Sequence, residues 1–298
     1  MSLRDLFLLF VLAALWGASF LFVRVAVPIF GPFLLVEGRV LLGGLILLCY
    51  ALAIGQAPNW RLYWKQYFII GMFNNALPFT LIAIAQLDMT ASLAALLNAT
   101  TPLFSAVIAA LWIQERLTIS KVFGLFLGIL GVGIIVGWQS DNFDPTRVNG
   151  ILLMLGASLS YGIAVVYGKT SFQGMNPVAT STGQLLSASL LILPFALANP
   201  VQQTLSNTAI LSLLGLAIFS TSIAYLIYFH LIEHAGPTNA ASVTLLIPFF
   251  SSLWGAIFLG EQLRTNEIMG FGVILVSLLL VTGIWRQFLD LRTTSKHV

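Results

Sequence analysis

Two stretches of the chain read alike, PLFSAVIAALWIQERLTISKVFGLFLGILGVGIIV at residues 102–136 and PFFSSLWGAIFLGEQLRTNEIMGFGVILVSLLLV at residues 248–281. Five residues recur 146 positions later: Pro102, Glu115, Leu117, Gly124 and Gly137 return as Pro248, Glu261, Leu263, Gly270 and Gly283. Nearer the N-terminus, Arg24 and Pro32 return as Lys169 and Pro177 at a spacing of 145. The chain therefore contains one unit twice, and an internal duplication in a hydrophobic chain is typical of membrane transporters.

The composition of the chain indicates a membrane protein. Hydrophobic residues make up 59% of its 298 residues and charged residues 8%, against about 25% charged in a typical soluble domain. A membrane-spanning helix needs about 20 apolar residues, and ten segments have that length: residues 4–27, 33–54, 65–86, 91–113, 119–138, 148–169, 178–198, 208–231, 238–260 and 266–285. We predict an all-α integral membrane protein of ten transmembrane helices, in two five-helix repeats at residues 1–143 and 144–298.

The loops between these segments are too short to form a soluble catalytic domain. We therefore expect no enzyme activity, no cofactor and no nucleic-acid partner. The single cysteine, Cys49, cannot form an intrachain disulfide. The first apolar segment has no small-residue cleavage site before a polar stretch, so we expect an uncleaved first helix.

Positive charges are distributed unevenly among the predicted loops. With the N-terminus in the cytoplasm, nine Lys and Arg lie inside and three lie outside, namely Arg24, Arg147 and Arg264. The positive-inside rule then predicts that both termini are cytoplasmic. Because each repeat holds an odd number of spans, the second repeat is inverted relative to the first, and such repeats place their site near the membrane midplane.

The quoted stretches carry a family resemblance. Each has Glu-Arg/Gln-Leu after its fourth helix and a glycine-rich fifth helix, and together they resemble the EamA-type repeats of the drug/metabolite transporter superfamily over nearly the whole chain. The resemblance, nearest to YddG-type amino-acid and aromatic amino-acid exporters, implies ten helices, a central cavity between the halves and export of small metabolites. It also implies a secondary transporter working by alternating access in the cytoplasmic (inner) membrane of a bacterium. The direction of transport rests on the resemblance alone.

Two prolines fall near the middle of the fourth and ninth predicted spans. Pro102 and Pro248 each remove a backbone hydrogen bond and free the carbonyl four residues earlier, at Asn98 and Thr244. Both copies thus place a polar side chain beside an unsatisfied carbonyl at membrane depth. The kink is either repaired locally or lines a cavity, and we predict a cavity with the two prolines as hinges.

Aromatic and amide residues also recur at matching positions. Trp16 aligns with Tyr161, and each precedes a glycine that lets a helix pack closely. Paired aromatic rings suit an apolar or aromatic ligand, although ordinary packing explains them equally well. Adjacent residues point about 100° apart on a helix, so only one of Asn74 and Asn75 faces a cavity, and we predict Asn74. The predicted substrate-binding residues are Trp16, Asn74, Asn98, Tyr161, Tyr225 and Thr244, and Phe79, Tyr228 and Trp254 could extend this lining.

No charged residue lies near the centre of a predicted span. Arg24, Glu37, Arg39 and Lys169 are within about two turns of a membrane face, where long side chains reach the headgroups. We therefore expect an uncharged cavity, which suits a neutral or zwitterionic substrate better than a sugar phosphate. The related small multidrug exporters carry a buried glutamate in their first helix, which this chain lacks, so proton-coupled export of cationic drugs is disfavoured.

The end of the eighth predicted span carries an H-x-x-E-H pattern, His230, Glu233 and His234. In some zinc proteases two such histidines bind zinc. A membrane-embedded zinc hydrolase is nevertheless a distant alternative, because no soluble lobe would hold a peptide, and we expect no metal site. The three residues share a helical face, so His230 and Glu233 could instead form a proton-sensitive gate or simply a polar helix end in water.

These patterns together predict the partners of the chain. We expect the lipid bilayer and a small-molecule substrate, most simply amino acids with apolar or aromatic side chains. Lipophilic drugs or nucleotide-like metabolites are the second choice, and a non-transporting scaffold or receptor fits poorly because the loops offer little surface. The small-residue pair Gly124 and Gly128 favours close packing within a monomer, with a homodimer through the fifth and tenth spans as the alternative.

Overall fold

The computed structural model describes residues 2–136, 145–201 and 203–282. All regular structure within these ranges is helical, and nine helical segments are long and apolar enough to cross a membrane. The elements are α1 (Leu3–Ala53), α2 (Trp60–Gly71), η1 (Met72–Ala76), α3 (Leu77–Ala85), α4 (Ala91–Asn98), α5 (Thr101–Trp112), α6 (Ile119–Val136), α7 (Pro145–Ser171), α8 (Pro177–Ala198), α9 (Asn207–Ala217), η3 (Ile218–Ile223), α10 (Ala224–Ala235), α11 (Pro237–Ala241), α12 (Val243–Leu259) and α13 (Thr265–Thr282).

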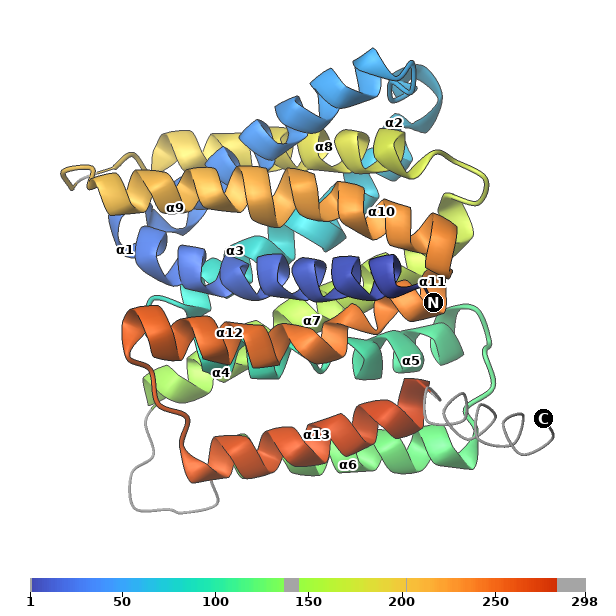
Figure 1. The fold of residues 1–298 in the computed structure, drawn as a ribbon, viewed down its shortest axis with the longest axis vertical. Coiled ribbons are helices and arrows are strands. Elements are labelled where there is room, and N and C mark those ends of the chain that lie inside the picture. The colour runs from blue at the N-terminus through green and yellow to red at the C-terminus, as the bar shows by residue number, and fades with distance from the viewer. Residues whose placement is uncertain (1, 137–144, 202, 283–298) are drawn as a thin grey trace.

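The first helix contains two spans. α1 has 51 residues, and at 1.5 Å per residue a straight helix of that length would exceed twice the ~30 Å hydrocarbon core. Between Pro28 and Pro32 the backbone leaves the helix at Gly31, with φ 72° and ψ 163°, a conformation that favours glycine. Figure 1 shows the second leg of α1 running back across the bundle. The nine helical segments therefore give the ten spans predicted from the sequence.

The two repeats share a structural feature that their sequences do not indicate. The third span of each contains a turn of π-helix, η1 in the first repeat and η3 in the second, and these turns begin 146 residues apart. Such turns are rare and concentrate at functional sites. The N-terminus and the end of α13 lie at the same face of the bundle (Figure 1), which we call the N-terminal face. The predicted boundary between residues 143 and 144 lies outside the described residues and stays a prediction.

The first span of each repeat packs against the proline-bearing span of the other. A Cβ atom on Gly17 of α1 would lie 2.7 Å from Cβ of Phe250 in α12, and one on Gly162 of α7 would lie 3.0 Å from Cβ of Phe104 in α5. The predicted close approach at these glycines is thus present. It joins the two repeats around the space described below.

Replacing Gly17 with alanine tests this contact. The new methyl group would overlap Phe250 and the backbone nitrogen of Ser251, 2.9 Å away, so we expect a loss of about 1–3 kcal/mol in stability. The measurement is the thermal unfolding midpoint in detergent. Gly133→Ala is the matched control, because nothing lies within 4 Å of that Cβ position; a midpoint for Gly17→Ala equal to that of the control would contradict the contact.

The fifth and tenth spans, α6 and α13, pack against each other at one edge of the bundle (Figure 1). Ser277 Oγ donates a 2.6 Å hydrogen bond to the Gly124 carbonyl. A Cβ on Gly128 would lie 2.9 Å from the same Ser277 hydroxyl, and one on Gly131 would lie 2.9 Å from the Gly270 carbonyl. The small residues of these helices therefore serve packing within the chain.

Candidate functional site

A cavity of about 620 Å³ lies between the two repeats. Its wall includes all six residues predicted to bind substrate and both predicted hinge prolines: Trp16, Asn74, Asn98, Tyr161, Tyr225, Thr244, Pro102 and Pro248. These come from α1, η1, α4, α5, α7, α10 and α12, so both repeats contribute. The inverted repeat thus brings residues far apart in sequence to one enclosed space.

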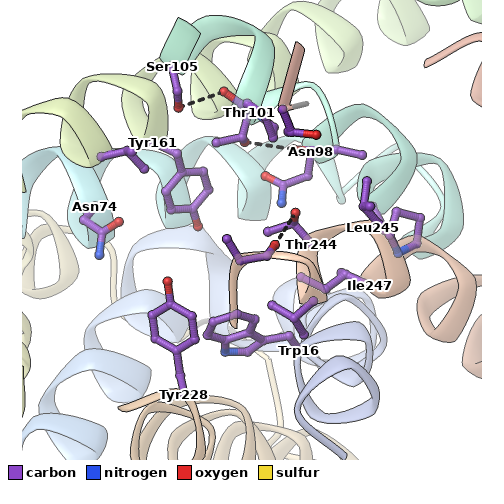
Figure 2. Close-up of a pocket in the computed structure, with 18 of the residues that line it drawn as sticks. Trp16, Asn74, Asn98, Thr101, Ser105, Tyr161, Tyr228, Thr244, Leu245 and Ile247 are labelled. Atoms are coloured by element: carbon purple, nitrogen blue, oxygen red, sulfur yellow. Dashed lines mark hydrogen bonds between the residues drawn. The ribbon is translucent and has the colours of Figure 1, made fainter. Parts of the chain in front are cut away.

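Aromatic rings form much of the cavity wall. Figure 2 shows Tyr161 and Tyr228 reaching in from opposite walls with their hydroxyl groups pointing toward each other. Trp16 lies against Tyr228, with ring centroids 5.2 Å apart, and Phe79 also lines the space. Trp254 does not line it, contrary to the sequence-based expectation; its indole Nε1 donates to the Ala14 carbonyl at 3.1 Å and ties α12 to α1.

The two adjacent asparagines of η1 face different surroundings. Asn74 lines the cavity, and its Nδ2 donates to Gln184 Oε1 of α8 at 3.1 Å. Asn75 is fully buried and accepts a 3.4 Å hydrogen bond at Oδ1 from the Tyr225 hydroxyl. The structure therefore places Asn74 on the wall and Asn75 between helices.

The fourth span is two helices rather than one kinked helix. α4 ends at Asn98, whose carbonyl accepts a 2.8 Å hydrogen bond from Thr101 Oγ1, and Ser105 Oγ donates to the Thr101 carbonyl at 3.1 Å (Figure 2). Pro102 stands in the first turn of α5, where a missing N–H costs nothing. Asn98 Oδ1 is buried and has no hydrogen-bond partner among the described residues. The residue lines the cavity, while this oxygen is shielded within the wall.

The ninth span breaks at a different point. α11 and α12 meet at Ser242, and Thr244 Oγ1 donates to the Ala241 carbonyl at 2.9 Å. Pro248 lies inside α12, so the ninth span breaks before its proline. Hydroxyl groups of Thr101, Ser242 and Thr244 satisfy backbone carbonyls beside the two breaks. The hinge role of Pro102 and Pro248 stays a prediction.

The expectation of an uncharged cavity is also wrong. Arg39 lines the cavity and is only 8% exposed. Its Nε donates to Thr221 Oγ1 of η3 at 3.1 Å, and its guanidinium carbon lies 3.7 Å from the centroid of the Phe79 ring. Its distance from the membrane face would let the side chain reach the headgroups, but its side of the helix faces the interior of the bundle, and the side chain lines the cavity instead.

A signal for Arg39 was present in the repeat. Gln184 follows Arg39 at the same 145-residue spacing as the Pro32 and Pro177 pair. Gln184 contacts Asn74 of η1, and Arg39 contacts Thr221 of η3. Each residue thus reaches the π-helical turn of the other repeat, and a polar pair at matched positions within spans would have indicated an interior role.

Glu37 departs from the same expectation. Its side chain is buried, and its Oε1 accepts a 2.6 Å hydrogen bond from Ser189 Oγ of α8. The carboxyl group therefore bonds within the bundle instead of reaching the headgroups.

Charged side chains mark the mouth of the cavity at the N-terminal face. Lys121 Nζ and Lys169 Nζ lie 2.6 and 3.4 Å from the two carboxylate oxygens of Glu115. The hydrogen bond from Lys121 lowers the pKa of the Glu115 carboxyl below its usual range, so the group stays ionised at neutral pH. All three line the cavity, and the Lys169 side chain is 65% exposed. The cavity therefore opens toward this face.

The opposite face of the bundle is closed by polar contacts. Glu261 Oε1 accepts from the Ala91 backbone N–H at 2.8 Å. Its Oε2 accepts from the Ser92 N–H at 3.0 Å and from Ser92 Oγ at 2.6 Å. Arg24 Nη1 donates to the Gln86 and Leu87 carbonyls. The Glu261 bonds join the segment after α12 to α4, and the Arg24 bonds join α1 to the segment after α3. Together they separate the cavity from that face.

The H-x-x-E-H residues lie away from this space. His230 and Glu233 are not part of the cavity wall; His230 Nε2 is 3.9 Å from Asp5 Oδ1, and its ring stacks on His234 at 4.0 Å. Within the described ranges, no group of three or more His, Cys, Asp or Glu side chains could hold a metal ion. The gate role of His230 and Glu233 stays a prediction.

Comparison with known proteins agrees with this architecture. The model of the EamA-like transporter family matches residues 4–137 and 148–283. The chain is 29% identical over 281 residues to the uncharacterized transporter YvbV of Bacillus subtilis, covering 93% of this chain and 91% of that protein. It is 27% identical over 288 residues to a probable amino-acid metabolite efflux pump of Salmonella typhimurium, covering 93% and 94%.

Further relatives extend the comparison. The uncharacterized inner membrane transporter YedA of Escherichia coli is 27% identical over 277 residues, covering 92% of this chain and 89% of that protein. A solved crystal structure with 20% sequence identity superposes with a TM-score of 0.64 over 97% of this chain and 99% of that chain. The structural match shows a shared fold.

Proposed function

The chain belongs to the EamA-like transporter family, and we propose that it carries small amino acids with apolar or aromatic side chains across the cytoplasmic membrane of a bacterium. It is a multi-pass membrane transporter by family. A relative named as a probable amino-acid metabolite efflux pump supports the substrate class and the outward direction. The excess of Lys and Arg at the N-terminal face supports a cytoplasmic location for that face.

The observation that carries the proposal is the cavity itself. Its volume of about 620 Å³ falls in the ~300–1,000 Å³ range typical of small-molecule sites. Aromatic rings lie beside amide and hydroxyl groups on its wall, which suits a molecule with an apolar side chain and a polar end. Both repeats build it and its charged mouth lies at the N-terminal face, so rocking the repeats about it would expose the same site to the other face.

Counterflow in proteoliposomes tests the proposal. Vesicles preloaded with one unlabelled amino acid are exposed to a labelled panel from threonine and methionine to tryptophan, with and without a pH gradient. We expect transient accumulation of apolar and aromatic amino acids. Accumulation of lipophilic drugs or nucleotides instead, with none of any amino acid, would contradict the proposed substrate class.

A further inference from the structure

Arg39 carries a positive charge that the protein does not neutralise. None of the ion pairs among the described residues includes it. Its Nε bonds to Thr221, while its two terminal NH₂ groups have no hydrogen-bond partner within the described ranges. A buried charge is stable only when it is paired or bonded to a partner of opposite charge or to water. The two terminal NH₂ groups of this guanidinium are therefore free to bind a partner on the cavity side.

Two contacts orient the Arg39 guanidinium so that it can bind a planar anion. The Phe79 ring lies 3.7 Å from the guanidinium carbon and supports the guanidinium by a cation–π contact. The Thr221 bond fixes Nε, which leaves Nη1 and Nη2 side by side. Two parallel N–H donors match the two oxygens of a carboxylate, the pairing in which arginine binds most specifically.

The charged side chains of the cavity wall carry a net positive charge. Its ionisable acids and bases are Arg39, Lys121, Lys169 and Glu115, three cations against one carboxylate. Lys121 and Lys169 lie with Glu115 at the mouth, and Arg39 is buried farther inside the bundle. A cavity with a net positive charge attracts ligands of negative charge.

We propose that Arg39 binds the carboxylate group of the substrate, so that this carrier selects organic monocarboxylates and rejects the corresponding amines. The inference rests on the proposed function and specifies its substrate class. An amino group is tolerated but not required, because the only carboxylate on the described cavity wall, Glu115, is paired with Lys121 and Lys169. One guanidinium matches a single negative charge better than the double charge of a phosphate ester.

Neutralisation of the Arg39 charge also couples substrate binding to the conformational change of the carrier. Closing the repeats around an empty cavity would bury the guanidinium without a partner, which is unfavourable. A bound carboxylate removes that cost, so the loaded carrier changes conformation more readily than the empty one. Exchange of substrate across the membrane is then faster than net transport, and this difference depends on Arg39.

Substrate analogues that share one side chain test the proposal in the wild-type protein. Counterflow of labelled phenylalanine is measured against competing phenylalanine, 3-phenylpropanoate, phenylalanine amide, phenethylamine and phenyl phosphate. We expect the two carboxylates to compete, and the amide and the amine to compete at least about tenfold more weakly, the scale of a lost charge-assisted hydrogen bond.

Variants of Arg39 test whether this residue causes the preference for carboxylates. Arg39→Gln introduces the residue that the second repeat has at the matching position, and we expect about 10- to 100-fold weaker competition by carboxylates with little change for the amine. Arg39→Lys keeps the charge and should retain part of the preference. Arg61→Gln is the matched control, because Arg61 is exposed in α2 and does not line the cavity. The ratio of exchange to net efflux should fall in Arg39→Gln alone.

Each outcome separates the two proposals. If the wild-type protein gives no counterflow of any amino acid, the proposed function fails. If counterflow occurs but phenethylamine competes as well as phenylalanine, or Arg39→Gln weakens both equally, the role of Arg39 is overturned and the carrier function stands. Stronger competition by phenyl phosphate than by 3-phenylpropanoate would overturn the carboxylate in favour of phosphate. The wild-type analogue series decides these points even if Arg39→Gln fails to fold.

Discussion

Replacing Glu261 with alanine is expected to open the closed face of the cavity. The Glu261 carboxylate accepts three hydrogen bonds from Ala91 and Ser92 at the N-terminal end of α4, where the helix dipole favours a negative charge. Removing it leaves two backbone N–H groups unpaired. Hydrogen bonds to charged groups contribute about 1.5–3 kcal/mol, so we expect closure to weaken by roughly 3 kcal/mol, or about 100-fold in the ratio of closed to open protein.

Cysteine labelling measures this opening. Ser105→Cys places a single thiol on the cavity wall in a Cys49→Ser background, and a membrane-impermeant maleimide is added at the face opposite the N-terminus. Glu261→Ala should raise the labelling rate strongly. Glu115→Ala is the matched control, because the corresponding acid of the first repeat bonds to Lys121 and Lys169 at the other face. Equal labelling in the two variants would show that Glu261 does not hold the closure.

Replacing Trp16 with alanine is expected to reduce flux about tenfold or more. The indole forms part of the cavity wall and packs on Tyr228 at 5.2 Å. An apolar side chain that loses this contact gives up buried area worth about 25 cal/mol per Å² and an aromatic contact of about 0.5–1.5 kcal/mol. Asn98→Ala should likewise lower flux, because it removes a polar side chain from the cavity wall.

The counterflow assay checks both variants at equal protein per vesicle, with gel filtration in detergent as the measure of folding. Trp112→Ala is the matched control for Trp16→Ala. Trp112 is 53% exposed and lies outside the cavity wall. Unchanged flux in both Trp16→Ala and Asn98→Ala would remove the proposed site, whereas loss of flux in Trp112→Ala would indicate a general effect on the bundle.

Much of the fold could be predicted because the repeat constrains it. The 146-residue spacing from Pro102 to Pro248 aligns the two halves, and span lengths follow from bilayer thickness. Residues such as Asn98 and Tyr161 could be predicted for the cavity wall because polar or aromatic side chains at matched depth in both repeats converge on the interface between them. The π-helical turns carry no comparable sequence signal, so they could not be predicted.

The errors share a physical cause. The expectation for Arg39 rests on its distance along the helix from the membrane face. Whether a side chain can reach water depends instead on which side of the helix faces the bundle. Trp254 was placed in the cavity by residue type, and its bond to the Ala14 carbonyl depends on the crossing of α1 and α12. Periodicity within one helix cannot specify such contacts between distant segments.

We expect substrate to enter the space between the repeats from the N-terminal face. The most direct test is labelling of Ser105→Cys, with Cys49→Ser, in right-side-out and inside-out membrane vesicles. We predict faster labelling from the cytoplasmic side than from the outer side, slowed by saturating phenylalanine and unaffected by phenethylamine. Labelling only from the outer side, or a labelling rate that a transported amino acid does not change, would contradict entry of substrate from the N-terminal face.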